Sequence, residues 1–127
     1  MAEFQKVHGY IEDGFPRVTS ASDLVRYELA PEQVESYHHN GFLCGIRVLE
    51  PVQVAELSER LESIRSSLYK HIDRLYEVEA DYLERPKEVV FHFLGAWLVD
   101  EWFHDIIFSP QVTVPVGQLL GTREVRF

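Results

Sequence analysis

The sequence predicts a single α+β domain that is rich in helix and poor in strand. Two stretches with apolar residues at helical spacing, residues 51–78 and 95–108, are the main evidence for helices. Two short apolar or alternating runs, residues 42–49 and 123–127, are typical of strands. With 127 residues, the chain suits one domain with a real core and leaves little room for two.

Charge and composition restrict the partners that the chain can have. It carries 12 Lys and Arg against 21 Asp and Glu, a formal charge of −9. Nucleic acids and anionic membranes attract basic surfaces, so we expect neither as a partner. The longest apolar run, residues 89–99, is interrupted by His92 and is too short to cross a bilayer, and the N-terminus lacks a signal-peptide pattern. We therefore expect a cytoplasmic protein, and its single cysteine excludes an intrachain disulfide.

Residues 1–28 are predicted to form an N-terminal arm that lies over the domain. The segment contains Gly9, Gly14 and Pro16, which are typical of loops. One short strand is expected within it, near residues 15–19.

The first helix is expected over residues 31–40. Pro31 suits the first helical position, where its missing N–H costs nothing. Asn40-Gly41 is a stop signal, because glycine adopts the left-handed conformation that commonly ends helices. The run that follows, FLCGIRVL at residues 42–49, is short, apolar and partly β-branched, which predicts a buried strand.

A long helix is expected to begin at Pro51. Apolar residues alternate at spacings of four and three along it and form a core stripe with one histidine. The stripe consists of Leu57, Leu61, Ile64, Leu68, His71, Leu75 and Val78. Arg85-Pro86 must end the helix, and a bend or break is expected between residues 76 and 85, because an unbroken helix is too long for so small a domain.

The C-terminal third of the chain predicts two more helices between extended segments. Residues 89–93 are β-branched at their start and are expected to be extended, and residues 95–108 have helical spacing. Ser109-Pro110 separates that helix from a second one over residues 111–120. Residues 123–127 alternate charged and apolar side chains like a strand, and because the chain stops within that pattern we expect it to be truncated.

The tripeptide His71-Ile72-Asp73 matches the H-x-D pattern of non-haem iron sites, but its predicted position excludes that role. Residues two apart on a helix point in nearly opposite directions, so one ion cannot take both ligands. We expect His71 to face the core or another helix and Asp73 to be solvated. Nucleotide-binding, nucleophile-elbow and zinc-protease motifs do not occur in the sequence.

Two further pairs have the spacing of neighbours on one helix face. Asp100 and His104 are four residues apart, and so are Glu101 and Asp105. The first pair could share a metal ion, but no third ligand is evident nearby, and we expect ordinary surface pairing.

The remaining candidate residues favour structural roles. His38-His39 lies before a helix stop, where imidazolium is favourable. His92 lies between two phenylalanines and is expected to be a satisfied core residue. Cys44 lies in an apolar run without an adjacent base and is expected to be an inert core thiol.

A series of short motifs follows in a fixed order along the chain. They are LAPEQVESY at residues 29–37, NGFL at 40–43, VLEP at 48–51, VAEL at 54–57, RLE at 60–62, II at 106–107, SP at 109–110, LLG at 119–121 and EVRF at 124–127. With these motifs the chain resembles the N-terminal part of the phytanoyl-CoA dioxygenase family. In that family a short helix ends at Gly-Phe, a strand follows, and a long helix comes next. The resemblance covers most of residues 29–65 and 92–127.

The resemblance implies that residues 29–127 are the N-terminal portion of a double-stranded β-helix, or jelly-roll, with its sheet incomplete in this chain. The family is Fe(II)- and 2-oxoglutarate-dependent. Its H-x-D lies a few residues beyond the V-R-F step, and a later His and Arg complete the ligands, so no iron or 2-oxoglutarate ligand carries over onto this chain. Only structural positions carry over: Gly41, Phe42, Leu57, Leu61, Leu120, Gly121 and Val125.

Two functions therefore stand as expectations. In the first, the chain is the front part of an oxygenase that oxidises a small organic substrate with Fe(II) and 2-oxoglutarate, and Trp97 and Trp102 are candidates for one wall of its substrate pocket. In the second, the chain is a complete, non-enzymatic module that dimerises through the apolar stripe of residues 57–78.

Overall fold

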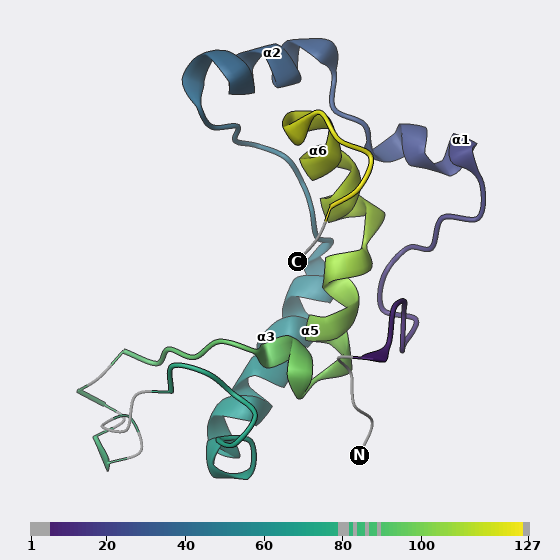
Figure 1. Cartoon of the computed structure of the whole chain (residues 1–127). Helices are drawn as coiled ribbons and strands as arrows, with labels where there is room; N and C mark the ends of the chain where they lie inside the picture. The colour runs from purple at the N-terminus through teal and green to yellow at the C-terminus, as the bar shows by residue number, and fades with distance from the viewer. Residues whose placement is uncertain (1–5, 79–81, 83, 86, 89, 126–127) are drawn as a thin grey trace.

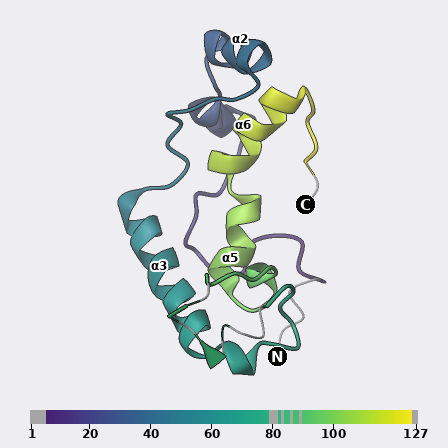
Figure 2. The same cartoon turned by 90° about the vertical axis from the view of Figure 1, so that its left-hand side faces the viewer.

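The computed structural model describes residues 6–78, 82, 84–85, 87–88 and 90–125. Helices follow one another along a curved molecule, with α2 at one end, the loop after η3 at the other, and α3, α5 and α6 between them (Figures 1 and 2). The helical elements are α1 Ala21–Leu24, η2 Val25–Tyr27, α2 Pro31–Asn40, α3 Pro51–Ser66, η3 Leu68–Lys70, η4 Ala96–Leu98, α5 Glu101–Asp105, η5 Ile106–Phe108 and α6 Pro110–Leu120, where η denotes a 3₁₀-helix.

Helices α2 and α6 confirm the predictions made from their end signals. Both have proline in the first turn. Gly41 ends α2 with a φ of 79°, and Gly121 ends α6 with a φ of 64°, both in the left-handed region. The two helices also pack against each other, so this pair forms one end of the molecule (Figure 1).

Helix α3 is shorter than predicted, because it ends at Ser66 rather than near residue 76. The hydroxyl groups of Ser66 and Ser67 donate to the carbonyl oxygen of Ser63, at 3.0 and 2.7 Å. Such bonds compete with the helical pattern of the backbone. The chain then tightens into η3 and a turn, so the predicted break comes about ten residues early.

The apolar stripe nevertheless continues past the end of α3. Leu57, Ile64, Leu68 and Leu75 are all buried, whereas Leu61 is exposed. The partly buried side chains packed on this core come from later in the chain and include Val78, Phe91, Phe93, Ala96, Val99 and Phe103. His71 is half-buried. The predicted inward side is therefore confirmed at Leu57, Ile64, Leu68 and Leu75 but not at Leu61, and beyond Ser66 no α-helix carries it.

The buried strand predicted at residues 42–49 is wrong. The segment is an irregular connection between α2 and α3 (Figure 1), and Phe42 is 62% exposed. Gly45 has a φ of 81°, which interrupts any extended run. A strand also needs a neighbour, and within the described residues none lies beside it.

The described residues contain only one trace of sheet, an antiparallel bridge between Tyr76 and Leu94, whose backbones exchange hydrogen bonds of 2.9 and 2.7 Å. Residues 15–19, 90–93 and 123–125 form no strand. Residues 89, 126 and 127 lie outside the described part of the chain.

The helix predicted over residues 95–108 is broken into η4, α5 and η5. Gly95 has a φ of 92° and precedes η4. The Asp100 carboxylate accepts hydrogen bonds from the backbone N–H groups of Trp102 and Phe103, at 2.9 and 3.1 Å, and so starts α5. An aspartate that caps a helix must itself lie outside it, which explains the break. No helix within the described ranges has both the length and the apolar character needed to cross a bilayer.

Candidate functional site

The densest polar site of the described structure lies where the N-terminal arm crosses α5. Its centre is the Asp105 carboxylate, which is 1% exposed. The backbone N–H of Ile11 donates to both carboxylate oxygens, at 2.9 and 3.0 Å, and the N–H of Glu12 donates to Oδ2 at 2.7 Å. Asp105 thus binds two consecutive backbone donors of the arm, as an anion binds a backbone nest.

His104 lies beside this carboxylate and is equally buried. Its Nδ1 is 2.8 Å from Oδ1 of Asp105, and its Nε2 is 3.1 Å from the carbonyl oxygen of Val7. The imidazole therefore links α5 to a second point of the arm. The ring also packs against Phe108, with ring centroids 5.2 Å apart.

Tyr10 fastens the same stretch of the arm to η5. Its hydroxyl lies 3.0 Å from the carbonyl oxygen of Phe108 and 2.9 Å from that of Pro16. Burial of the phenol, together with the nearby charge of Asp105, raises the pKa of Tyr10 to about 12. Tyr10 therefore stays protonated at any physiological pH.

A second, more exposed layer is organised by Arg60 of α3. Its guanidinium contacts the Asp100 carboxylate at 3.1 Å, Glu56 at 2.6 Å and Glu12 of the arm at 3.3 Å. It also lies over the Trp102 ring, 5.3 Å from the ring centroid. One arginine thus connects α3, the arm and the start of α5.

Trp102 closes this layer against the arm. Its Nε1 donates to a Glu12 carboxylate oxygen at 3.0 Å, and Phe15 packs edge-on against it with a centroid distance of 5.1 Å. The side-chain amide of Gln53 donates to the carbonyl oxygen of Gly14 at 2.9 Å, directly beside this contact. Residues 7–16 are therefore held along α5 and α3 by both polar and aromatic contacts.

This arrangement is suited to holding a segment of backbone rather than to chemistry on a small molecule. The Asp105 oxygens already accept from the arm, and the His104 nitrogens already face Asp105 and Val7. A general base or nucleophile needs a lone pair directed at a reactant. The site is therefore a docking site for the chain's own arm.

The sequence predicted two residue pairs on one helix face, Asp100–His104 and Glu101–Asp105. In the structure the two side chains of each pair contact different partners. The Asp100 side chain caps α5 and contacts Arg60, whereas His104 faces the arm. Asp105, noted from the sequence only as the partner of Glu101 in a carboxylate pair, is buried. No local pattern indicates its role, because its donors lie 93 and 94 residues away along the chain.

The H-x-D segment is in a turn, where His71 is half-buried and Asp73 is exposed. Within the described ranges, no cluster of three or more histidine, cysteine, aspartate or glutamate side chains is placed to hold a metal ion. These residues therefore do not fit an iron centre by themselves.

Two structural expectations for single residues are wrong. Cys44 was expected in the core but is exposed, because the segment that carries it forms no strand and pairs with none in the described part of the chain. His92 was also expected in the core, but about half of its side chain is exposed and its Nε2 lies 3.3 Å from a Glu77 carboxylate oxygen. His38 and His39 do lie in the last turn of α2, as predicted.

The two tryptophans proposed for a pocket wall lie at different places. Trp102 packs between Phe15 and Arg60, and Trp97 is a partly exposed residue of η4. Their role in a substrate pocket stays a prediction. Among known proteins, neither the family models nor the curated sequences contain a match to this chain.

Proposed function

We propose that this chain forms the helical N-terminal part of a phytanoyl-CoA dioxygenase-like oxygenase. Such an enzyme uses Fe(II) and 2-oxoglutarate to oxidise a C–H bond of a small organic substrate. The observation that carries the proposal is the order of elements: α2 is capped by Gly41, a segment without a strand partner among the described residues follows, and α3 begins at Pro51. This is the order in which the motifs of the family occur, apart from the pairing of the middle segment into a strand.

The surface of the middle segment supports the same proposal. Phe42 is 62% exposed and Val52 is 72% exposed, and Val48 and Val54 are exposed as well. Leaving a large apolar side chain in water forfeits roughly 1.5–3 kcal/mol compared with burying it. A sheet packed over residues 42–54 would cover these side chains, and the segment would gain the strand partner that the described residues do not offer.

In this proposal the chain supplies a scaffold rather than the iron ligands. The described residues hold no cluster that fits iron, and in the family the ligands follow the V-R-F step. The helices support the sheet, and Trp97 and Trp102 are the candidates for one wall of the substrate pocket. The single cysteine is compatible with a cytoplasmic location for the enzyme.

The test is to read the messenger RNA beyond the Phe127 codon and to express the protein it encodes. We expect a His-x-Asp within a few residues, and Fe(II)-dependent conversion of 2-oxoglutarate to succinate by the product. A variant with alanine at that histidine is the matched control and must lose the succinate. A stop codon directly after Phe127, or a continuation without Fe(II)-dependent turnover, overturns the proposal.

The 127-residue chain offers a second measurement. Titration with Fe(II) in a calorimeter should give no stoichiometric site, because the ligands of this class of enzyme follow the V-R-F step. A site with micromolar affinity within residues 1–127 would mean that Asp100, His104 or His71 binds metal after all.

The alternative function, dimerisation through the stripe of residues 57–78, has less support. Leu57, Ile64, Leu68 and Leu75 are buried by other parts of the same chain. A second copy could reach them only if those contacts opened, so a homodimer would have to use another face. No observation in the described structure favours this function over the first.

A further inference from the structure

We propose that residues 90–94 form a self-complementary strand edge, through which two copies of this chain pair as an antiparallel dimer. This dimer is independent of the proposed oxygenase function and does not use the stripe of residues 57–78. Three features of the segment carry the inference: its exposure pattern, the direction of its backbone hydrogen bonds and the order of its side chains.

The segment has the alternating exposure of a strand with one face on a core. Phe91 and Phe93 are partly buried and pack on the main core, whereas Val90, His92 and Leu94 are exposed. Successive side chains of an extended chain point to opposite faces in this way. In the single chain only Leu94 has a bridge partner among the described residues, so the segment has the shape of a strand without its pairing.

The bridge at Leu94 fixes the direction of the backbone groups. The N–H and carbonyl of Leu94 exchange hydrogen bonds with Tyr76, at 2.7 and 2.9 Å, so both point toward Tyr76. These directions alternate along a strand, so the groups of Phe91 and Phe93 point to the opposite edge. No hydrogen bond between described residues uses the backbone of Phe91 or Phe93. Within the described part of the chain, that edge is open to a second strand.

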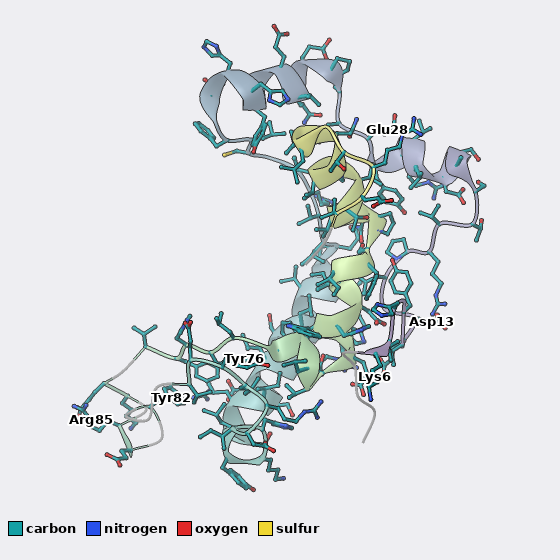
Figure 3. The ribbon with its side chains drawn as sticks, in the orientation of Figure 1. Lys6, Asp13, Glu28, Tyr76, Tyr82 and Arg85 are labelled. Carbon is teal, nitrogen blue, oxygen red and sulfur yellow. The ribbon has the colours of Figure 1, made fainter. Side chains whose placement is uncertain are left out.

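The segment also lies where a partner can reach it. The residues before η4 run as an extended stretch away from α3 and α5 (Figure 1). Figure 3 shows Tyr76 near the helices, with Tyr82 and Arg85 farther out in the same projection. Val90, at the outer end of the segment, is 82% exposed.

The order of the side chains matches a two-fold axis through His92. The sequence VFHFL reads LFHFV in reverse, with aromatic and aliphatic positions unchanged. In an antiparallel pair centred on His92, Phe91 lies opposite Phe93 of the second copy, and Val90 lies opposite Leu94. The backbone directions agree with this register, because Phe91 and Phe93 both present their N–H and carbonyl groups at the open edge.

Both faces of the paired strands gain contacts in this register. On the core face, Phe91 lies beside Phe93 of the second copy. On the outer face, Leu94 lies between Tyr76 of its own copy and Val90 of the other, and all three are exposed in the single chain. Such cross-strand apolar pairs stabilise a sheet. An imidazole can both donate and accept, so two His92 side chains are compatible neighbours at the axis.

The charge distribution allows a second copy to approach at this place. Each chain has a formal charge of −9, so two copies repel each other in general. Residues 89–99 contain no Asp, Glu, Lys or Arg, so pairing here brings no like charges opposite each other. The edge also lacks the lysine or proline with which many proteins block edge-to-edge pairing.

The first test measures the wild-type chain as a function of concentration. The interface is one short strand pair, so we expect a weak dimer that forms between about 1 and 500 µM in analytical ultracentrifugation. Hydrogen exchange over the same range should show protection of the Phe91 and Phe93 amides rising with the dimer fraction. The Leu98 amide, which donates to Gly95 within the chain, should keep its protection.

Two cysteine variants in a Cys44→Ser background test the register. At the axis the two Cα atoms of residue 92 lie about 4.5 Å apart, which suits a disulfide, whereas those of residue 90 lie roughly 14 Å apart. Under mild oxidation His92→Cys should therefore cross-link at least about tenfold faster than Val90→Cys. Association through the exposed residues 42–54 adds to the dimer but gives no such difference.

A charge at the edge tests the contact itself. Val90→Lys places an ammonium group opposite Leu94 of the second copy and should weaken the dimer about tenfold or more. Val25→Lys is the matched control, because Val25 is 62% exposed and lies in η2, and it should leave the dimer unchanged.

Three results overturn the proposal. The first is a wild-type chain that stays monomeric up to about 500 µM. The second is a dimer in which the Phe91 and Phe93 amides gain no protection. The third is equal cross-linking of the two cysteine variants. The first two are measured on the wild-type chain, so the outcome does not depend on whether a variant folds.

Discussion

At the scale of single residues, side-chain groups satisfy backbone groups that a sheet would otherwise pair. The Gln118 amide accepts from the N–H of Leu29 at 2.6 Å and donates to its carbonyl oxygen at 3.4 Å, as a strand neighbour would. Gln53 accepts from the N–H of Glu50 at 2.9 Å and donates to Gly14. Backbone polar groups need partners wherever they are shielded from water. Glutamine suits this role because its amide both donates and accepts.

Gly14 is the residue at which a single added carbon should cost most. A Cβ at this position would lie 2.6 Å from two atoms of the Trp102 ring, which Phe15 and Arg60 hold in place. We expect Gly14→Ala to lower the free energy of unfolding by about 1–3 kcal/mol through overpacking. Chemical denaturation of the purified chain measures this change.

A double mutant identifies the cause. In a Trp102→Leu background the smaller side chain leaves room for the added methyl, so Gly14→Ala should cost clearly less there. An equal cost in both backgrounds would assign the effect to the backbone of residue 14 rather than to the indole ring.

At the scale of elements, α1 depends on one carboxylate at its N-terminus. Asp23 accepts from the backbone N–H groups of Thr19 and Ser20, both at 3.0 Å, and from the Thr19 hydroxyl at 2.9 Å. These bonds, led by the one from the Thr19 backbone, lower the pKa of Asp23 from 3.8 to about 2. The charged form is therefore the one that starts the helix.

The pH dependence of α1 follows from that shift. Because the pKa of Asp23 is lower in the folded chain, its contribution is complete above about pH 4 and disappears as the pH falls through about 2. NMR titration of the Asp23 carboxyl carbon should give a midpoint near 2 in the wild-type chain. In Thr19→Val the midpoint should move up toward 3.8, because the side-chain donor is lost.

Thr113→Val is the matched control for this titration. The Thr113 hydroxyl donates to the carbonyl oxygen of Ser109 at 3.0 Å, in α6, so the Asp23 midpoint should not change. A wild-type midpoint at 3.8 would show that the Asp23 hydrogen bonds do not persist in solution.

At the scale of the whole molecule, the apolar surface between α2 and α3 should control association. Phe42 is 62% exposed and Val52 is 72% exposed. Exposed apolar surface of this kind promotes association between chains. We expect the double variant Phe42→Ser and Val52→Ser to associate less than the wild type, as measured by size-exclusion chromatography with light scattering. The free energy of unfolding should change little, because neither side chain is buried.

Leu68→Ser provides the contrast, because Leu68 is 1% exposed in the main core. This change should lower stability and increase association. If the surface variant associates as much as the wild type, residues 42–52 are not the face through which chains meet.

The sequence by itself determined the parts of this protein whose causes are local. Proline at the start and glycine at the end specified α2 and α6, because both act through the backbone of their own residue. The three–four spacing of apolar residues correctly marked Leu57, Ile64, Leu68 and Leu75 as buried, although Leu61 of the same pattern is exposed.

Only the tertiary structure decided the features that need a distant partner. Residues 42–49 have the composition of a strand, yet a strand forms only beside another strand, and none of the described residues provides one. Asp105 has the spacing of a surface carboxylate, yet it is buried because two N–H groups from the other end of the chain reach it. Such contacts depend on where the whole chain places its ends, and no short pattern in the sequence encodes that.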